Sequence, residues 1–362
     1  MLVTVVAAAY FALFAIFAGN LVYLRRTSTL RSAGQESAPP RLSVLIPARN
    51  EEANLQRLLP TLLTQDYPNL QVIVVDDESD DDTWAVLSSF ADDRLTAIRG
   101  SGPQPGWVGK VHALYVAAQS ADGELFLFLD ADAELLHSRA LRDIVSRKLQ
   151  LPPNAVLTGI TRLRGGGDLL VSLVPHAMLV AIPWFLVGRG PALLGGLNGQ
   201  CWVISASQYR LLDPHLANRG EILEDVMIGR FLSRNGLVPT LTDLQGDVAV
   251  HMYSTYRKAW AGFRKNAYLV MGGSLLSFVL CFVAFFTVYL IGPATSWWIL
   301  ALFFSLKALT DARSGFPLWV SALAPASFMA AVALQLDSAF AHWRGRVSWK
   351  DRQLGARPQD GP

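Results

Sequence analysis

The sequence contains little cysteine and little charge. Among its 362 residues there are two cysteines, Cys201 in a predicted strand and Cys281 in a predicted apolar helix. Two isolated cysteines in such different surroundings argue against a disulfide framework and a cysteine metal site, and are typical of small buried hydrophobic residues. Charged residues make up 17% of the chain, and its net charge of +2 gives no basis for nucleic-acid binding.

Apolar residues are abundant instead. They make up 52% of the chain, and the mean hydropathy of +0.31 is high for an ordinary soluble domain. Residues 3–24 carry no charge over about the 20 residues that a bilayer-spanning helix needs, and the run ends at Arg25 and Arg26. We interpret this run as a signal-anchor helix. The alternative, a cleaved signal peptide, is disfavoured because no basic residue precedes the apolar run.

Basic residues gather just after this helix. Arg25, Arg26, Arg31 and Arg41 stand against one acid, Glu36, and the positive-inside rule then places the N-terminus outside and the next domain in the cytoplasm. We therefore predict a multi-pass protein of the cell (inner or plasma) membrane. The predicted segments are a transmembrane anchor at 1–26, a linker at 27–41, an α/β domain at 42–270, membrane segments at 271–341 and a basic cytoplasmic tail at 342–362.

Three apolar runs follow the α/β domain, at about 273–292, 296–310 and 317–341. If all three crossed the membrane, the basic tail would lie outside, against the positive-inside rule. The middle run is the shortest and leads into charged residues between Lys307 and Arg313. We therefore expect it to be a re-entrant or tilted segment.

Short apolar runs alternate with amphipathic ones between about residues 42 and 250. A predicted strand, LSVLIPA, is followed by a helix from about Glu52 to Leu63, a second strand, LQVIVVDD, and a helix from about Asp82 to Phe90. This alternation predicts an α/β domain with a Rossmann-like, mixed but mostly parallel sheet. In such sheets ligands bind beyond the carboxyl ends of the strands.

Polar clusters lie at three of the predicted strand ends. PARNEE follows Ile46, DDESDDDT follows Val75 and DADAE follows Leu129, so the clusters should converge. Acids at one edge would repel one another unless a cation or hydrogen-bond donors lay between them. An Asp-x-Asp arrangement suits Mg²⁺ or Mn²⁺ that also binds water and a substrate diphosphate. The acids concerned are Asp76, Asp77, Asp130 and Asp132.

The block PGWVGKVHAL adds flexible glycines and a cation, Lys110, at the start of a predicted helix. This arrangement fits contact with a phosphate or a nucleotide. Each feature also has a structural explanation. An Asp at a strand end is often a turn former or an N-cap, and we expect one of Asp80, Asp81 and Asp82 to cap the next helix. Lys110 by itself is typical of a solvated surface charge, but several such explanations would have to coincide at successive strand ends.

Five motifs in a fixed order carry a resemblance to a known family. SVLIPARNEEANL, VIVVDDESDDDT, GWVGK, LFLDADAEL and ILEDVMIGRFL together resemble the family-2 glycosyltransferases, inverting enzymes of the GT-A fold that use nucleotide-diphosphate sugars. The resemblance covers about residues 42–270. The PGWVGKVHAL block, the leading anchor helix and the trailing apolar segments are most similar to the membrane subgroup associated with hopanoid and carotenoid glycosylation.

The resemblance implies a donor-binding role for the first three motifs. In this family the first motif begins the nucleotide pocket, the second contacts the nucleobase and the third helps to hold the nucleotide. The matching residues of this chain are Pro47, Arg49 and Glu51, then Asp76 and Asp77, then Lys110.

The last two motifs imply a metal and a base. Asp130 would face the ribose or the donor sugar, and Asp132 would face the Mn²⁺ or Mg²⁺ on the diphosphate. Asp225 would be the catalytic base, with Glu224 beside it, because an inverting transfer needs a carboxylate to take the proton of the acceptor hydroxyl. The structural alternative is that both acids complement the dipole of the helix that they begin. His251 is either a third metal ligand or a structural histidine.

The chain departs from the processive members of the family. They carry a Q-x-x-R-W sequence after the base, whereas this chain reads HMYSTYRKAWAGFRKNAYLVMGG, so we infer a single sugar transfer. Four basic residues in this region either meet the diphosphate or lie at lipid headgroups. They are Arg257, Lys258, Arg264 and Lys265.

Residues 168–197 bear on the acceptor. They are strongly apolar, but Pro175, Pro183 and several glycines disfavour one straight spanning helix. We expect an interfacial segment beside the active site, with ordinary core packing as the alternative. An interfacial segment favours a lipid acceptor: a hydroxylated carotenoid, a hopanoid or other terpenoid, a sphingoid or glycerolipid, or polyprenyl phosphate. UDP-glucose is the donor that the family favours.

Two functions of other kinds stay open. The chain could be a membrane scaffold that binds a nucleotide sugar without turnover, although the complete D-x-D and Asp225 argue against it. The second of these functions is phosphoryl or nucleotidyl transfer by the same α/β domain. The lack of a G-x-x-x-x-G-K-[ST] loop disfavours it.

Overall fold

The computed structural model describes residues 1–29, 39–350 and 352–353. These residues form two compact units. Unit 1 comprises Met1–Val22, Leu163–Phe185 and Met252–Pro362, and unit 2 comprises Tyr23–Arg162 and Leu186–His251. Most of the predicted linker and the end of the predicted basic tail lie outside the described residues.

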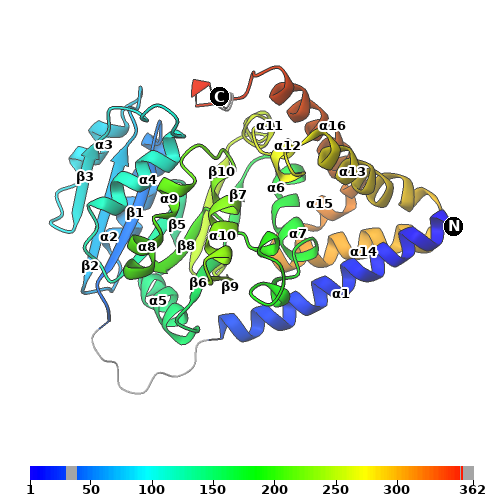
Figure 1. Cartoon of the computed structure of the whole chain (residues 1–362), viewed down its shortest axis with the longest axis horizontal. Coiled ribbons are helices and arrows are strands. Elements are labelled where there is room, and N and C mark those ends of the chain that lie inside the picture. The colour runs from blue at the N-terminus through cyan, green and yellow to red at the C-terminus, as the bar shows by residue number, and fades with distance from the viewer. Residues whose placement is uncertain (30–38, 351, 354–362) are drawn as a thin grey trace. The chain divides into compact units, whose positions relative to one another are not determined.

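Unit 2 is built on a seven-stranded sheet with the strand order β3-β2-β1-β4-β8-β6-β9 (Figure 1). Its neighbouring strands pair in parallel except at β8, which is antiparallel to both β4 and β6. The predicted mixed, mostly parallel α/β sheet is therefore confirmed. The strands are β1 (Leu42–Ala48), β2 (Leu70–Asp76), β3 (Leu95–Arg99), β4 (Leu125–Leu129), β6 (Ala155–Ile160), β8 (Cys201–Ser205) and β9 (Val238–Asp243).

The helices of unit 2 follow the predicted amphipathic pattern. In α2 (Glu52–Leu63), which has the predicted bounds, the buried residues are Leu55, Leu58, Leu59 and Leu62, the spacing of one helix face. The second predicted helix, α3, spans Thr83–Ser89. The other helices are α4 (Gly109–Gln119), α5 (Ala140–Gln150), α8 (Ala206–Leu212), α9 (Pro214–Ala217) and α10 (Glu224–Arg234).

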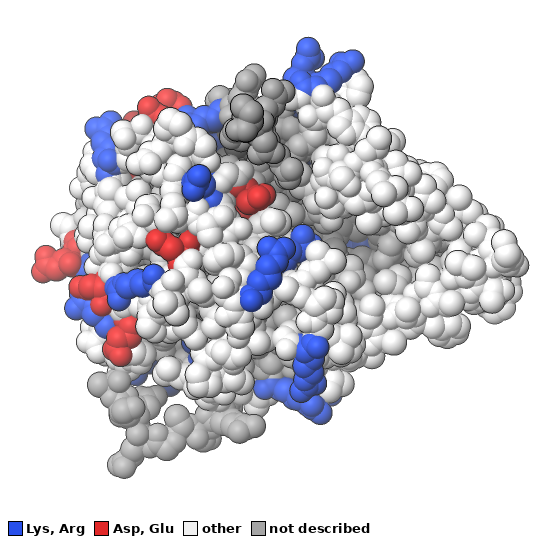
Figure 2. Space-filling model, in the orientation of Figure 1, with Lys and Arg blue, Asp and Glu red and all other residues white. Residues whose placement is uncertain are grey.

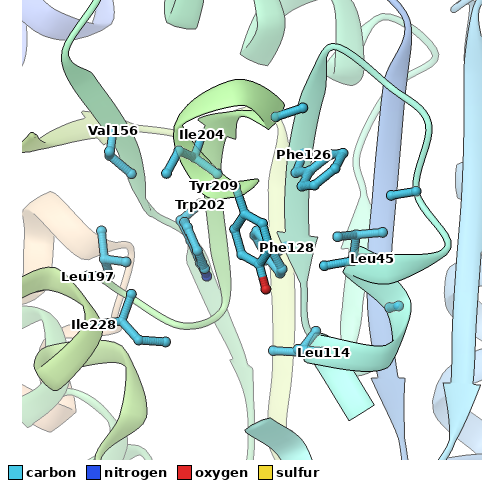
Figure 3. Close-up of a cluster of buried hydrophobic side chains, with 14 of the residues drawn as sticks. Leu45, Leu114, Phe126, Phe128, Val156, Leu197, Trp202, Ile204, Tyr209 and Ile228 are labelled. Atoms are coloured by element: carbon cyan, nitrogen blue, oxygen red, sulfur yellow. The ribbon is translucent and has the colours of Figure 1, made fainter. Parts of the chain in front are cut away.

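The core of unit 2 lies where β4 and β8 pair. Every residue of β4 is buried, as expected of a strand covered on both faces. Phe128 stacks on Trp202 of β8 with 4.0 Å between the ring centroids. Leu197, before β8, and Ile228, in α10, belong to the same buried cluster (Figure 3). The segments that carry the predicted acids are thus fixed to one rigid core.

Unit 1 is mostly helical. Its helix α1 (Leu2–Ser28) continues into unit 2, and the strands β7 (Arg162–Gly165) and β10 (Val248–Tyr253) also cross the boundary between the units. The other helices are α6 (Asp168–Val171), α7 (Leu173–Val180), α11 (Tyr256–Arg264), α12 (Ala267–Val270), α13 (Leu275–Phe286), α14 (Trp297–Ser314), α15 (Leu318–Ala322) and α16 (Ala324–Trp343).

The apolar segment after Asp168 is interrupted, as its prolines predicted. Helix α7 ends at Val180, and a short 3₁₀ turn follows at Trp184–Leu186. The buried side chain of Asn20 in α1 bridges this break: its amide donates to the carbonyl oxygens of Leu179 and Ile182, and its oxygen accepts from the Trp184 N–H. Backbone groups freed by the break are therefore satisfied without water.

A second buried polar network joins the helices of unit 1. Lys307 in α14 lies 2.5 Å from Asp311 and donates to the hydroxyl of Ser172 at 3.0 Å. Ser321 donates to the other carboxylate oxygen of Asp311 at 2.7 Å. Both charged side chains are almost fully buried, with exposed fractions of 0% and 1%, so this ion pair is balanced and closed to solvent.

Four helical segments are long and apolar enough to cross a membrane. In Figure 2 the surface over α13 and over the N-terminal part of α1 carries almost no charged residues, whereas most of the visible Lys, Arg, Asp and Glu lie elsewhere. The four segments are Leu2–Ser28, Asp168–Leu186, Leu275–Ala294 and Ala324–Trp343. Among the described residues α14 is not one of these candidates; its predicted re-entrant path stays a prediction.

Candidate active site

The first two acidic motifs meet through an arginine. The Arg49 guanidinium follows β1 and donates to the carbonyl oxygen of Asp77 at 2.8 Å and to that of Glu78, and it pairs with Asp80 at 3.1 Å. Pro47, just before it, stands opposite Val75 in the parallel register of β1 and β2. The predicted convergence of PARNEE with DDESDDDT is therefore present, and Arg49 holds the two loops together.

The acids of the second motif differ in their surroundings. Asp76 is buried, and its carboxylate accepts from the N–H and the hydroxyl of Ser79 at 3.1 and 2.5 Å, the geometry of a turn-forming Asp. The N–H of Asp77 donates to the carbonyl oxygen of Ala48 at 2.7 Å, and the N–H of Glu51 donates to the Thr83 hydroxyl at 2.8 Å. Donor contact by Asp76, Asp77 and Glu51 stays a prediction.

One of the three acids expected to cap α3 bonds to the first residue of that helix. The carboxylate of Asp81 accepts from the N–H and the hydroxyl of Thr83, the first residue of the helix. Asp82 occupies the N-cap position without a side-chain capping bond. The structural explanation therefore holds for Asp81 and leaves the neighbouring acids for other contacts.

Lys110 joins the third motif to the last two. It lies in the first turn of α4, and its Nζ is 2.7 Å from Asp130 Oδ1 and 3.0 Å from Glu224 Oε1. Burial lowers the pKa of Lys110, but the charges of Asp130 and Glu224 outweigh it and hold the pKa well above its usual value. Lys110 is therefore a fixed cation between two acidic motifs, not the solvated surface charge of the structural alternative.

Asp225 is half-buried at the start of α10. Its Oδ1 accepts from the Val226 N–H at 2.8 Å, and its Oδ2 accepts from the Gly199 N–H at 3.2 Å. Burial first, and then the charge of Glu224, raise the pKa of Asp225 to about 6, against the lowering effect of Lys110 and the two N–H donors. A carboxylate with this pKa is ionised at neutral pH and is a better proton acceptor than an ordinary Asp.

His251 contacts Asp132 through its backbone and Glu134 through its side chain. The N–H of His251 in β10 donates to the carbonyl oxygen of Asp132 at 2.8 Å, and its Nε2 lies 2.8 Å from Glu134 Oε2. Glu134 belongs to the short strand β5 (Ala133–Leu135), which pairs with β10. The carboxylates of Asp130 and Asp132 are the hard oxygen ligands that Mn²⁺ and Mg²⁺ prefer, so the donor set fits such an ion. The metal role of His251 stays a prediction.

A different group in unit 2 also has the composition of a metal site. Ligand atoms of His137, Asp143 and Asp247 lie within 4.8 Å of one another. Arg147 already pairs with Asp247 at 2.8 Å, however, and His137 lies 3.2 Å from the same carboxylate. The carboxylate of Asp247 is thus already held by an arginine and a histidine.

The sheet relates these clusters to one another. Strand β1 is flanked by β2 and β4 in parallel, so the ends that carry Arg49, Asp76 and Asp130 lie at one edge. Lys110 in α4 pairs with Asp130 at the end of β4 and with Glu224 at the start of α10. Asp132 directly precedes β5. The contacts thus form one set around Arg49, one around Lys110 and one around His251.

Sequence reasoning missed the loop Leu197–Gln200, which contacts both Asp130 and Asp225. Its signal was the run GGLNGQ directly before β8, where three glycines and two amide side chains precede a buried strand. The contacts of this loop are made mainly by backbone groups, and such contacts cannot be predicted from the types of residue in the sequence.

The basic residues of α11 do not act alike. Arg264 pairs with Asp337 at 3.1 Å, and the indole N–H of Trp260 donates to the other oxygen of that carboxylate, all within unit 1. Arg257 and Lys258, in the first turn of the helix, are exposed. Arg264 therefore has a local structural partner, whereas Arg257 and Lys258 keep both predicted alternatives.

Comparisons with known proteins find a family and a relative for this chain. Residues 43–176 match the family model described as Glycosyl transferase family 2. The 4,4'-diaponeurosporenoate glycosyltransferase of Staphylococcus haemolyticus is 26% identical to this chain over 94% of its length and 96% of the relative.

Solved structures with similar folds are more distant. The mannosyltransferase PcManGT of Pyrobaculum calidifontis, in complex with GDP-Man and Mn²⁺, is 20% identical with a TM-score of 0.49, and the match covers 96% of this chain and 100% of that one. Glucosyl-3-phosphoglycerate synthase of Mycobacterium tuberculosis, with Mn²⁺, UDP and phosphoglyceric acid, is 21% identical with a TM-score of 0.42 over 61% and 76% of the two chains.

The mixed sheet, its acidic carboxyl edge and the family match define a glycosyltransferase with a GT-A fold. Residues 43–176 of the chain carry the match to glycosyl transferase family 2, and the chain is distantly related to 4,4'-diaponeurosporenoate glycosyltransferase over nearly its full length. The resemblance found in its five motifs is thereby confirmed.

Proposed function

We propose that this enzyme is an inverting, metal-dependent transferase that moves a single sugar from a nucleotide-diphosphate sugar, with UDP-glucose as the favoured donor, to a membrane lipid hydroxyl. One observation carries the proposal: Lys110 ties Asp130 of the D-x-D motif to Glu224, and Asp225 lies next to Glu224. A donor-binding acid and a carboxylate with base character are thus held in one ionic cluster.

The base acts on the acceptor. Asp225 takes the proton of the acceptor hydroxyl as that oxygen attacks the anomeric carbon, and the bond from this carbon to the leaving diphosphate breaks. The pKa of about 6 leaves Asp225 ionised at neutral pH. The N–H groups of Gly199 and Val226 each hold one of its oxygens, so a lone pair keeps a fixed direction.

The donor end depends on the D-x-D motif. Asp132, with Asp130 nearby, would hold Mn²⁺ or Mg²⁺, which would stabilise negative charge on the leaving diphosphate. Lys110 fixes Asp130 from one side and can also reach a phosphate oxygen, as the family resemblance implies. Pro47, Arg49, Glu51, Asp76 and Asp77 would form the nucleotide pocket.

The acceptor is proposed from two sources. The relative named for 4,4'-diaponeurosporenoate supports a carotenoid or another terpenoid lipid, which includes hopanoids. The four apolar helical segments support a multi-pass protein of the cell membrane, with the α/β domain on the cytoplasmic side and residues 168–197 at the interface. A lipid acceptor would then reach the base from the bilayer.

A carboxylate acceptor is the second candidate, because 4,4'-diaponeurosporenoate, the compound in the name of that relative, is a carboxylate. The base separates the two. A hydroxyl must lose a proton during attack, whereas an ionised carboxylate needs no base. A base-like pKa at Asp225 therefore favours the hydroxyl.

The test uses purified full-length protein in lipid vesicles with labelled UDP- and GDP-sugars, Mn²⁺ or Mg²⁺, and total lipid extract as acceptor. We expect label in one lipid species, and its loss with a chelator or with Asp132→Ala. Asp122→Ala, at an exposed acid paired with Arg41, is the control and should keep activity. A labelled product that resists mild alkali indicates a glycoside of a hydroxyl, and one that is hydrolysed indicates an ester. Nucleotide binding without labelled lipid would favour the scaffold function instead.

A further inference from the structure

The loop Leu197–Gln200 bonds to both catalytic motifs through its backbone. The Leu197 N–H donates to the carbonyl oxygen of Asp225 at 3.3 Å, and the Gly199 N–H donates to Asp225 Oδ2 at 3.2 Å. At the other end of the loop, the carbonyl oxygen of Gln200 accepts from the Asp130 N–H at 3.1 Å. Four consecutive residues therefore connect the D-x-D motif to Asp225.

The same loop is anchored to β6 and to the segment after it. The N–H of Asn198 donates to the Thr158 hydroxyl at 2.7 Å, and its side-chain amide donates to the carbonyl oxygen of Gly159 at 2.7 Å. The hydroxyl of Thr161 donates to the side-chain oxygen of Gln200 at 2.6 Å. Because these partners lie at the end of β6, which pairs with β8 and β9, the loop has a fixed position on the sheet.

Position 199 leaves little room for a side chain beside Asp225. A Cβ there would lie 3.2 Å from Asp225 Cβ, 3.3 Å from Asp225 Oδ2 and 3.5 Å from Lys110 Nζ. Any side chain would therefore enter the space between the carboxylate and the ammonium. The glycine lets the backbone N–H come within hydrogen-bond distance of the base without displacing the cation.

A second glycine fixes the helix that carries Asp225. Gly229 lies four residues further along α10, on the same helix face. A Cβ at Gly229 would lie 2.5 Å from Gly196 Cα, so loop and helix touch backbone to backbone. Leu197 and Ile228 add buried apolar packing at this junction (Figure 3).

We infer that Gly199 is a positioning residue: its N–H orients the carboxylate of Asp225 for proton transfer, and the loop Leu197–Gln200 keeps that carboxylate in register with Asp130. The inference rests on the proposed function, because it takes Asp225 as the base. Its chemical consequence is specific: an added methyl group at residue 199 turns the carboxylate but leaves the nucleotide pocket at the other strand ends intact.

The test is Gly199→Ala, measured as kcat and as KM for the sugar donor in lipid vesicles. We expect kcat to fall about 10- to 100-fold, because small misplacements of a reacting group cost rates of this order. The donor KM and the Kd for UDP should stay within twofold of the unaltered protein. The thermal midpoint should be unchanged. Gly246→Ala adds the same methyl group where nothing lies within 4 Å, and should leave kcat unchanged.

Two further variants guard against a folding defect. Asn198→Ala adds no atoms and removes one loop anchor, and should lower kcat about fivefold with the same unchanged donor KM. Gly229→Ala should show a structural pattern instead, in which thermal midpoint, donor binding and kcat fall together. A normal kcat in Gly199→Ala would overturn the inference.

Asp225→Asn, measured in parallel, separates this inference from the proposed function. If Asp225→Asn abolishes transfer while Gly199→Ala is fully active, the base stands and the positioning role fails. If Asp225→Asn keeps its turnover with a hydroxyl acceptor, the base assignment fails, and the inference fails with it.

Discussion

Each unit of the molecule holds a lysine among carboxylates, and the two arrangements differ in their balance of charge. In unit 1 the ammonium of Lys307 faces one carboxylate, that of Asp311, and hydroxyl groups complete the set in full burial. In unit 2 Lys110 faces Asp130 and Glu224 directly, with Asp225 close by, and its side chain is 18% exposed. The three carboxylates around Lys110 exceed its single positive charge by two.

This difference distinguishes a structural ion pair from a candidate active site. A balanced, buried pair with all its hydrogen bonds made offers nothing to a ligand and resists change. An excess of negative charge in a partly exposed cluster attracts a cation. It also favours proton uptake by a carboxylate of the cluster. Net charge and exposure together therefore distinguish the two lysine clusters, whereas the distances alone do not.

The largest effect is expected at the base of the unbalanced cluster. Asp225→Asn keeps the shape of the side chain but removes its proton affinity, so transfer to a hydroxyl acceptor should fall about 100- to 10,000-fold. Nucleotide binding, measured by titration calorimetry, should survive. Loss of binding along with turnover would show that Asp225 supports the fold of the pocket and not the proton transfer.

The balanced pair should respond in stability. Lys307→Met leaves the carboxylate of Asp311 buried without its cation, which costs about 3–5 kcal/mol. Thermal unfolding in detergent or lipid should show this loss. The double variant Lys307→Met with Asp311→Leu removes both charges and should recover most of the stability. A double variant as unstable as the single one would show that the unpaired buried charge is not the cause of the lost stability.

The smallest effect is a shift in the pH profile of kcat/KM. Because the base must be ionised, activity should fall as the pH drops below the Asp225 pKa of about 6. Lys110 lowers that pKa and Glu224 raises it. The acidic limb should therefore move to higher pH in Lys110→Met and to lower pH in Glu224→Gln, each by about one unit or less. Shifts of the same sign in both variants would exclude this electrostatic account.

The sequence predicted those features that depend on local pattern. The strand LSVLIPA, the helix Glu52–Leu63 and the acids at the ends of β1, β2 and β4 follow from the periodicity of apolar residues and from the rule that parallel strands end at one edge. These elements carry their own signal because burial repeats at two or about 3.6 residues.

Other features could not be predicted in this way. The bridge from Lys110 to Glu224 joins residues far apart in the sequence, and its side-chain chemistry was equally consistent with a surface lysine. Gly199 acts through a backbone N–H, which every residue other than proline has, so only the packing of its neighbours reveals the need for glycine. Asn20 was hidden because its polar side chain lies within an otherwise apolar run.

The bonds of Asn20 decide how this protein can be shortened for laboratory work. A first helix that only tethers an enzyme can be deleted or replaced, but the one here closes the backbone break between Leu179 and Trp184, and its Tyr10 hydroxyl also bonds to the carbonyl oxygen of Val288. Its last turn bonds to β9 through Thr27. Trimming the chain to obtain a water-soluble transferase would remove interior parts of both units, so biochemical work on this enzyme should begin from the intact chain in a bilayer mimic.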